Sequence, residues 1–498
     1  MGSRTILALV FSVLAVPAWA QESVAEKVRR YADAHRAAII AEYLKLLALP
    51  NIHGDASALK RNAALLRSMM QKRGLETELW DTSKGAPVVF AQKRVPGATR
   101  TMLFYIHYDG QPVDPKRWAQ ADPFVPVIRT ASMEAGGTVV ADLAGATYPD
   151  DWRIYARASG DDKAPIEAIL CALDAIGTPK QNVKIILDGE EEGGGPGLPE
   201  VIAKFPDKLK SDLLVMLDGP QHPSGRPTIY YGARGGVALN VTVFTAKQGM
   251  HSGNYGNWMP DANVRLAQLI AAMVGPTGKV AIPGFYGEVL PFLPAARAMI
   301  DAVPDQSPQM QKEFGVGSLD GAASSLDEAL NMPSFSVHDM KGGEVGGVIP
   351  ASASAQIEVR LVKDNDPQAM VGRITAFVRA QGYFITERNP DIATLASHAR
   401  VAKVVRGARN GAAWRTEPSD PQAAFATEAL RAVWGDRLVR LRTFGGSVPA
   451  AAFIDAYKVP TIGVAIANYD DNQHTDNENV RIGNIFDGMI TLAALMTH

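Results

Sequence analysis

Histidine and acidic side chains recur in this sequence where an apolar, strand-like run has just ended. The groups are His107 and Asp109 after TMLFYI, Glu190 to Glu192 after VKIIL, Asp218 after LLVML, and His474 after TIGVAIA. A further pair, Asp161 and Asp162, opens the helical stretch that starts near Lys163. In open α/β sheets, ligands bind at the carboxyl ends of the strands. We therefore expect these side chains to converge on one edge of a sheet.

Several carboxylates held together need a counter-charge. On their own they would repel one another and raise each other's pKa values, whereas a bound divalent cation favours the ionised forms. Two histidines with several Asp and Glu residues form a nitrogen and oxygen ligand set that suits zinc, with manganese or cobalt as competitors. Two metals bridged by one carboxylate would lie roughly 3.5–4 Å apart and activate a shared water. An extra glutamate that binds no metal could act as a general base.

The elements that must position these residues alternate along the chain. We expect strands at 101–109, 182–190, 212–219 and 459–468, and helices at 24–48, 58–73, 165–177, 198–205, 421–434 and 484–497. Such alternation is typical of an α/β layer with a largely parallel sheet flanked by helices.

Between about 231 and 410 the pattern changes. Half-exposed, alternating strands are expected at 235–246 and 353–362, and helices at 261–275 and 366–382. We predict an inserted α+β domain over residues 231–410, within a domain made of residues 21–230 and 411–498. Two domains also agree with a length of 498 residues.

Composition and charge exclude some classes of partner. The chain is 47% hydrophobic and 20% charged, which is globular, and its net charge of -2 does not favour nucleic acid or a polybasic membrane contact. Arg4, the apolar run ILALVFSVLAV and A-W-A before Gln21 are typical of a secretory signal peptide over residues 1–20. We therefore expect an exported protein, periplasmic or secreted, with no membrane contact after cleavage. Cys171 is the only cysteine, so no intramolecular disulfide is possible and packing is its expected role.

These motifs, in this order, resemble the M20 metallopeptidases. The matching segments are HYDGQP (107–112), SGDDK (159–163), GEEEGG (189–194), GMHSGNYGN (249–257), EVRLV (358–362) and GGSVP (445–449). The likeness spans nearly the whole chain after residue 20 and is greatest to the dipeptidase and carnosinase-like branch.

The resemblance implies a role for each matching residue. His107 and Asp218 would bind one metal, Glu192 and His474 the other, and Asp161 would bridge them. Glu191 would be the general base, and Asp109 would orient the ring of His107. Residues 231–410 would be a lid and dimerisation domain, and residues 21–230 with 411–498 the catalytic domain. His251 would reach the active site of the partner in a homodimer and stabilise the oxyanion. Arg360 would clamp the substrate carboxylate, in a pocket that Gly446 and Ser447 line.

Some assignments have alternatives, and some segments depart from the family. Glu190 and Glu191 could be the working pair instead, and Asp162 could replace Asp161 as the bridge. His251 could simply cap the helix after it, and Arg360 could be a surface residue. Ala156, Ala158 and Ala164 stand where relatives often have glycine, and residues 129–151 look like an extra segment, a potential flap near the substrate.

The sequence thus predicts an exported dinuclear metallopeptidase that cleaves dipeptides or short peptides beside a free carboxylate. An N-acyl- or N-carbamoyl-amino-acid amidohydrolase on the same scaffold is the enzymatic alternative, and a non-catalytic binding homologue is the other. Ser57 and Lys60 have the S-x-x-K spacing of penicillin-binding enzymes, but no K-T-G follows. GGGPG (193–197) lacks the ending of a phosphate loop.

Overall fold

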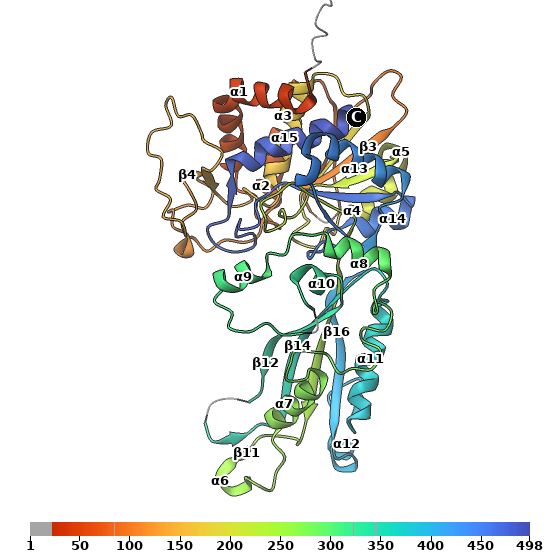
Figure 1. Cartoon of the computed structure of the whole chain (residues 1–498). Coiled ribbons are helices and arrows are strands. Elements are labelled where there is room, and N and C mark those ends of the chain that lie inside the picture. The colour runs from red at the N-terminus through yellow and green to blue at the C-terminus, as the bar shows by residue number, and fades with distance from the viewer. Residues whose placement is uncertain (1–21, 84, 322, 344–345) are drawn as a thin grey trace, which may run out of the picture.

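The structure, a computed structural model, describes residues 22–498 except 84, 322, 344 and 345, and gives only the backbone of 408–410. It has two parts, which we call the body and the arm (Figure 1). The body combines the chain before β9 (Gly232–Ala233) with the chain after β16 (Val401–Gly411). The arm is residues 235–411 and extends away from the body.

An eight-stranded sheet forms the centre of the body. Its strands lie in the order β1 (Glu76–Trp80), β2 (Val88–Lys93), β6 (Asn182–Asp188), β3 (Thr101–His107), β7 (Leu213–Met216), β19 (Thr461–Ala465), β8 (Thr228–Tyr230) and β18 (Val439–Leu441). The four central strands, β6, β3, β7 and β19, run parallel. The outer pairs β1–β2, β2–β6 and β19–β8 are antiparallel. The α/β class is as predicted, and the sheet is mixed, since its four central strands and its edge pair β8–β18 are parallel.

Helices cover both faces of this sheet, which explains the continuous apolar runs of its strands. One face packs against α1 (Val24–Leu47), α2 (Ala56–Lys72), α3 (Lys163–Ile176), α13 (Pro421–Trp434) and α15 (Ile482–Thr497). The other packs against α4 (Leu198–Lys204), α5 (Pro206–Leu209) and α14 (Ala450–Tyr457). Phe104 points to the first layer and Tyr105 to the second, as the alternation of a strand requires.

A polar cluster lies within the first helical layer, away from the sheet edge. Arg73, after α2, donates to Glu42 of α1 (Nη2 to Oε2, 2.6 Å) and to Asp174 of α3 (Nε to Oδ2, 2.8 Å). Beside them, the Cys171 thiol donates to Oε1 of the fully buried Glu167 (3.2 Å). The other oxygen of Glu167 has no hydrogen-bond partner among the described residues. Burial, and next the charge of Glu42, raise the pKa of Glu167 to about 8.

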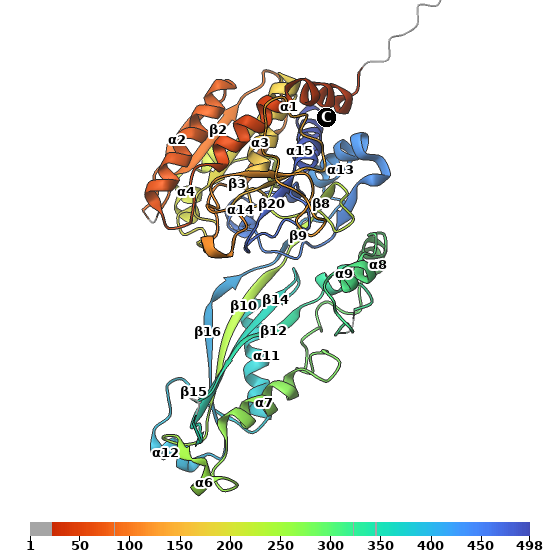
Figure 2. The same ribbon diagram turned by 90° about the vertical axis from the view of Figure 1, so that its left-hand side faces the viewer.

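The arm is built on a five-stranded sheet. Its order is β12 (Ser334–Lys341), β14 (Ser352–Leu361), β10 (Gly235–Phe244), β16 (Val401–Gly411) and β15 (Phe384–Thr386). All pairs are antiparallel except β15–β16. Two long helices, α7 (Ala262–Met273) and α11 (Pro367–Ala380), pack on one face (Figure 2). This is the α+β arrangement that the alternating strands predicted.

Short elements occupy the two ends of the arm. At the end far from the body lie β11 (Met250–His251), α6 (Ser252–Tyr255), β13 (Val348–Ile349) and α12 (Ile392–Ser397) (Figure 1). Nearer the body lie α8 (Pro294–Asp301), α9 (Ser307–Glu313) and α10 (Leu326–Leu330).

Two short strands join the arm to the body. On the way out the chain forms β9 (Gly232–Ala233), and on the way back it forms β17 (Trp414–Arg415). The two pair antiparallel, Trp414 opposite Ala233 and Arg415 opposite Gly232. Gly232 is needed here, because a Cβ at that position would collide with the carbonyl oxygen of Trp414.

The extra segment of residues 129–151 lies between two strands of a small sheet. Those strands, β4 (Val127–Arg129) and β5 (Arg153–Tyr155), join β20 (Asn479–Arg481) in the order β20-β5-β4. Its end is fixed to the helical layer, since Arg36 of α1 donates to the Tyr148 carbonyl (2.7 Å). Two short 3-10 turns, Pro115–Arg117 and Gly435–Arg437, complete the body. A role for residues 129–151 as a flap stays a prediction.

Candidate metal centre

The predicted ligands meet beyond the carboxyl ends of the central parallel strands. Two groups of potential metal donors form there, each with its ligand atoms within 4.8 Å of one another. One group is His107, Asp161 and Asp218, and the other is Asp161, Glu192 and His474. Asp161 belongs to both. Its Oδ1 lies 2.9 Å from His107 Nε2, and its Oδ2 lies 3.0 Å from His474 Nε2.

The histidine pKa values show how negative this region is. Hydrogen bonds to Asp161 and Glu192 raise the pKa of His474 to about 10, although its side chain is 52% exposed. Burial alone would lower the pKa of His107, but hydrogen bonds to Asp109 and Asp161 outweigh it and raise that pKa well above its usual range. The carboxylates thus favour a positive charge at both rings, a charge that a bound metal cation would also supply.

The pKa values of two neighbouring carboxyls are raised as well. Burial, and next the charge of Asp161, raise the pKa of Asp218 to about 7. Burial raises the pKa of Glu191 as well, with Asp218, Glu192 and Asp161 adding to the shift. The region thus carries more negative charge than its own cations balance. A divalent cation in each donor group would supply that charge, so the residues fit the predicted pair of metals.

Asp109 connects the glutamate loop to His107. Its Oδ1 lies 3.2 Å from His107 Nδ1, so the Nε2 of that ring faces Asp161. The same carboxylate accepts the backbone N–H groups of Glu191 (3.2 Å) and Glu192 (3.0 Å). It therefore orients a histidine and also fixes the loop that carries both glutamates.

The contacts of Glu190 and Asp162 bear on the two alternative assignments. The Glu190 carboxylate accepts backbone N–H groups of Gly54 (3.3 Å) and Ala86 (3.2 Å). Asp162 accepts the backbone N–H of His107 (3.2 Å). Neither belongs to the two donor groups around Asp161. The geometry therefore favours Glu191 with Glu192, and Asp161 as the shared carboxylate.

Sequence reasoning missed a buried ion pair beneath Asp161. The Glu478 carboxylate accepts the backbone N–H groups of Ala158 (2.9 Å), Gly160 (2.9 Å) and Asp161 (3.0 Å), and it pairs with Arg157 Nη1 at 2.7 Å. It thereby holds the loop before α3 in place. The run of polar residues after His474, DNEN, was the available signal.

Two glutamines were also missed. Gln111 donates to Glu192 Oε2 (2.7 Å), and Gln473 donates to Asp161 Oδ2 (3.2 Å). Gln111 lies within the HYDGQP segment, and Gln473 directly precedes His474. Each donates to an oxygen that could face a metal, and so helps to orient the ligand.

The remaining predicted residues lie apart from this cluster. Arg360, on β14, donates to Ser447 Oγ (3.1 Å), so the arm and the body touch there. The carbonyl of Gly446 accepts the N–H of Arg234 (3.1 Å). His251 lies at the far end of the arm, exposed, and its Nδ1 accepts the N–H of Gly253 (3.1 Å). Within one chain, then, His251 caps α6, which is the alternative weighed from the sequence.

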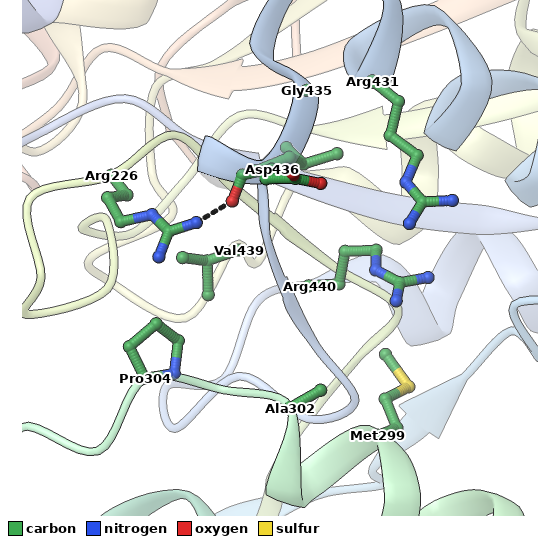
Figure 3. A pocket seen from close by; sticks show the side chains of 10 residues that line it. Arg226, Met299, Ala302, Pro304, Arg431, Gly435, Asp436, Val439 and Arg440 are labelled. Carbon is green, nitrogen blue, oxygen red and sulfur yellow. Dashed lines mark hydrogen bonds between the residues drawn. The ribbon is translucent and has the colours of Figure 1, made fainter.

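One pocket outside the cluster lies between α8 and the body. It measures about 160 Å³, and its lining includes Arg226, Met299, Arg431 and Arg440 (Figure 3). None of the predicted site residues lines it. It is therefore separate from the metal centre.

Curated relatives align with most of the chain. The human Beta-Ala-His dipeptidase is 26% identical over 421 residues, which is 82% of this chain and 76% of the relative. The Cys-Gly metallodipeptidase of Saccharomyces cerevisiae is 24% identical over 434 residues, which is 83% of this chain and 82% of the relative.

These relatives correct the prediction of export. Yeast Cys-Gly metallodipeptidases that match over 81% and 83% of this chain are cytosolic enzymes, so the predicted periplasmic or secreted location is wrong by this comparison. The segment on which it rested, residues 1–20, lies outside the described residues. No helix in the described part of the chain is both long and apolar enough to cross a bilayer.

Solved structures and a family model agree with the relatives. The M20 family metallo-carboxypeptidase Sso-CP2 from Sulfolobus solfataricus superposes with a TM-score of 0.73 at 26% identity, covering 92% of this chain and 98% of that one. Human carnosine dipeptidase 1 superposes with a TM-score of 0.74 at 23% identity, covering 95% of this chain and 98% of that one. The model of peptidase family M20/M25/M40 matches residues 103–498. With that match over most of its length, and acidic and histidine ligands gathered at the edge of its sheet, the chain belongs to this family and is a metallopeptidase.

Proposed function

We propose that this protein hydrolyses the amide bond of dipeptides or short peptides that carry a free carboxylate, with two divalent cations as cofactors. The observation that carries the proposal is the position of Asp161, whose two oxygens face the two donor groups. His107 and Asp218 would hold one cation and Glu192 and His474 the other. Zinc is the first choice for this set of nitrogen and oxygen ligands, ahead of manganese and cobalt.

Glu191 is the proposed general base. When bound, the two cations would polarise the scissile carbonyl and lower the pKa of an attacking water. The Glu191 carboxylate takes the proton of that water and delivers it to the leaving amine. Burial raises the pKa of this carboxyl, which favours its holding the proton between the two halves of the transfer. Asp109 keeps His107 in the orientation that binding requires.

Arg360 is the proposed anchor for the substrate carboxylate, with Gly446 and Ser447 in the same pocket. A guanidinium can bind a carboxylate through two parallel N–H groups, which a lysine cannot do. The contact between Arg360 and Ser447 supports this proposal, because it brings the arm against the body.

A homodimer would complete the site. His251 is far from its own metal centre, so it could stabilise the oxyanion only in a second chain. Exposed apolar side chains on the arm are available for such a contact, with Trp258 at 80%, Val264 at 52% and Met340 at 49% exposure. In this proposal residues 231–410 form the lid and dimerisation domain, and residues 21–230 with 411–498 form the catalytic domain.

A substrate panel tests the proposal. Purified protein would be stripped of metal, reloaded with zinc, manganese or cobalt, and given dipeptides, N-acyl amino acids and N-carbamoyl amino acids. We expect dipeptides to be cleaved fastest. Faster cleavage of either acylated class would establish the amidohydrolase alternative. No cleavage by protein that holds two metals would establish a binding protein.

A further inference from the structure

The side chain of Glu358 adjoins the proposed carboxylate anchor. Glu358 and Arg360 are two residues apart on β14, so both side chains leave the same face of the arm sheet. Glu358 Oε1 lies 2.9 Å from Arg360 Nε, and its other oxygen lies 3.4 Å from His338 Nε2. Arg360 also donates through Nη1 to Ser447 Oγ (3.1 Å), which in turn donates to the Arg234 carbonyl (2.7 Å). The Arg360 guanidinium therefore contacts Glu358 of the arm through Nε and Ser447 of the body through Nη1.

A second guanidinium lies behind the first. Arg234 is buried, and its Nη2 donates to the Met332 carbonyl (2.9 Å) and to Ser334 Oγ (2.8 Å). Burial, and next the charge of Arg360, lower the pKa of Arg234 to about 10, while the charge of Glu358 acts in the opposite direction. The three side chains therefore interact electrostatically. Together they carry two positive charges and one negative charge, a net charge of one.

We propose that Glu358 positions Arg360 and restricts the pocket to a C-terminal residue with only one carboxylate. This inference rests on the proposed function, in which Arg360 binds the main-chain carboxylate of the substrate. That carboxylate neutralises the single net charge of the cluster. A second carboxylate, on the side chain of a C-terminal Asp or Glu, would find the charge of these three side chains already neutralised and would be repelled by Glu358.

The distances indicate how strong the discrimination is. The main-chain carboxylate and Glu358 would both contact one guanidinium, which separates these two anions by about one guanidinium width. The side-chain carboxylate of a C-terminal Asp is joined to the main-chain carboxylate through only two carbons, so it would lie at a comparable distance from Glu358. Coulomb repulsion at roughly 5–6 Å in a partly desolvated site is enough to change a rate by about tenfold or more. Asparagine has the shape of aspartate without its charge. The pair Ala-Asn and Ala-Asp therefore isolates the electrostatic effect.

The experiment compares kcat/KM for these two dipeptides in metal-loaded protein. For the wild type we expect Ala-Asn to be preferred about tenfold or more. In Glu358→Gln the net charge of the cluster rises to two, so the preference should fall at least about fivefold, towards equality or reversal. Glu358→Asp keeps the charge and should keep the preference. Asp339→Asn is the matched control, because it removes one negative charge from the neighbouring strand β12, where Asp339 pairs with Lys341. This control should leave the preference unchanged.

The outcomes separate the inference from the proposed function. A wild-type ratio near one overturns the role of Glu358 without any variant, so the test does not depend on how Glu358→Gln folds. A folded Glu358→Gln that keeps the wild-type ratio overturns it too, as does an equal change in Asp339→Asn. If the metal-loaded wild type cleaves neither dipeptide, nor any other, the proposed function itself fails.

Discussion

Replacing the buried Glu167 with glutamine should stabilise the protein, and the gain should increase with pH. The pKa of this carboxyl is raised from 4.5 to about 8, chiefly by burial. When the pKa of a group is higher in the folded chain than in the unfolded chain, its contribution to the free energy of unfolding is fully present below the unfolded-state pKa. That contribution is lost as the pH rises towards and through the folded-state pKa. Between about pH 4.5 and 8 the folded chain retains a proton that the unfolded chain has released.

The size of the effect follows from the shift. Each pKa unit corresponds to about 1.36 kcal/mol. The difference between a pKa of 4.5 and one of about 8 therefore lowers the free energy of unfolding by about 5 kcal/mol above pH 8. At pH 7 the cost is about 3 kcal/mol by the same relation. Glutamine has no such cost. Its carbonyl oxygen can still accept from Cys171, and its amide takes the place of an oxygen that has no partner among the described residues.

Urea unfolding of the two proteins at pH 5, 7 and 8.5, with metal removed by a chelator, measures the difference. We expect near-equal unfolding free energies at pH 5 and a growing advantage for Glu167→Gln above it. Glu42→Gln is the matched control. Glu42 lies in the same cluster but pairs with Arg73, so its replacement should destabilise at every pH. A difference between Glu167→Gln and wild type that stays flat or turns negative with pH would refute the reasoning.

Three further predictions concern the metal centre. Glu191→Gln should keep both metals but lower kcat by about 10²–10⁴ in a dipeptide assay, since it removes the proton acceptor; near-normal turnover would exclude Glu191 as the base. Asp161→Asn should lower bound zinc below one ion per chain in elemental analysis, whereas Asp162→Asn should retain more; equal losses would remove the distinction between them. His251→Ala should reduce kcat with an unchanged thermal midpoint. Wild-type turnover, or an active monomer in sedimentation, would contradict the shared site.

The ligand positions could be predicted because they depend on local sequence. An apolar run followed by His107, or by Glu191 and Glu192, fixes both the strand and its last polar residue. The central strands β3, β6, β7 and β19 lie within the ranges expected from this pattern. To predict that these ligands lie together, one further assumption is enough, namely that the carboxyl ends of the strands meet at the same edge of the sheet.

What could not be predicted depends on distant partners. The outer strand β2 pairs antiparallel with β6, and nothing within VVFAQK specifies that direction. The ion pair of Glu478 could not be predicted either, since its partner Arg157 lies 321 residues earlier in the chain. The same limit applies to Glu358, whose position next to Arg360 is visible in the sequence, whereas the proximity of Arg234 is not.

The paired strands β9 and β17 have a mechanical consequence for the arm. Because both crossings of the chain are joined in one short ribbon, its two connections cannot slide independently, and a rotation of the arm would pivot near this ribbon. Arg360 lies opposite Gly236, only a few residues beyond that ribbon, whereas His251 lies at the opposite end of the arm (Figure 1). A given rotation would therefore barely displace the carboxylate anchor, while it would carry the distal histidine through a long arc. Substrate anchoring and oxyanion contact would then respond very differently to the same small movement.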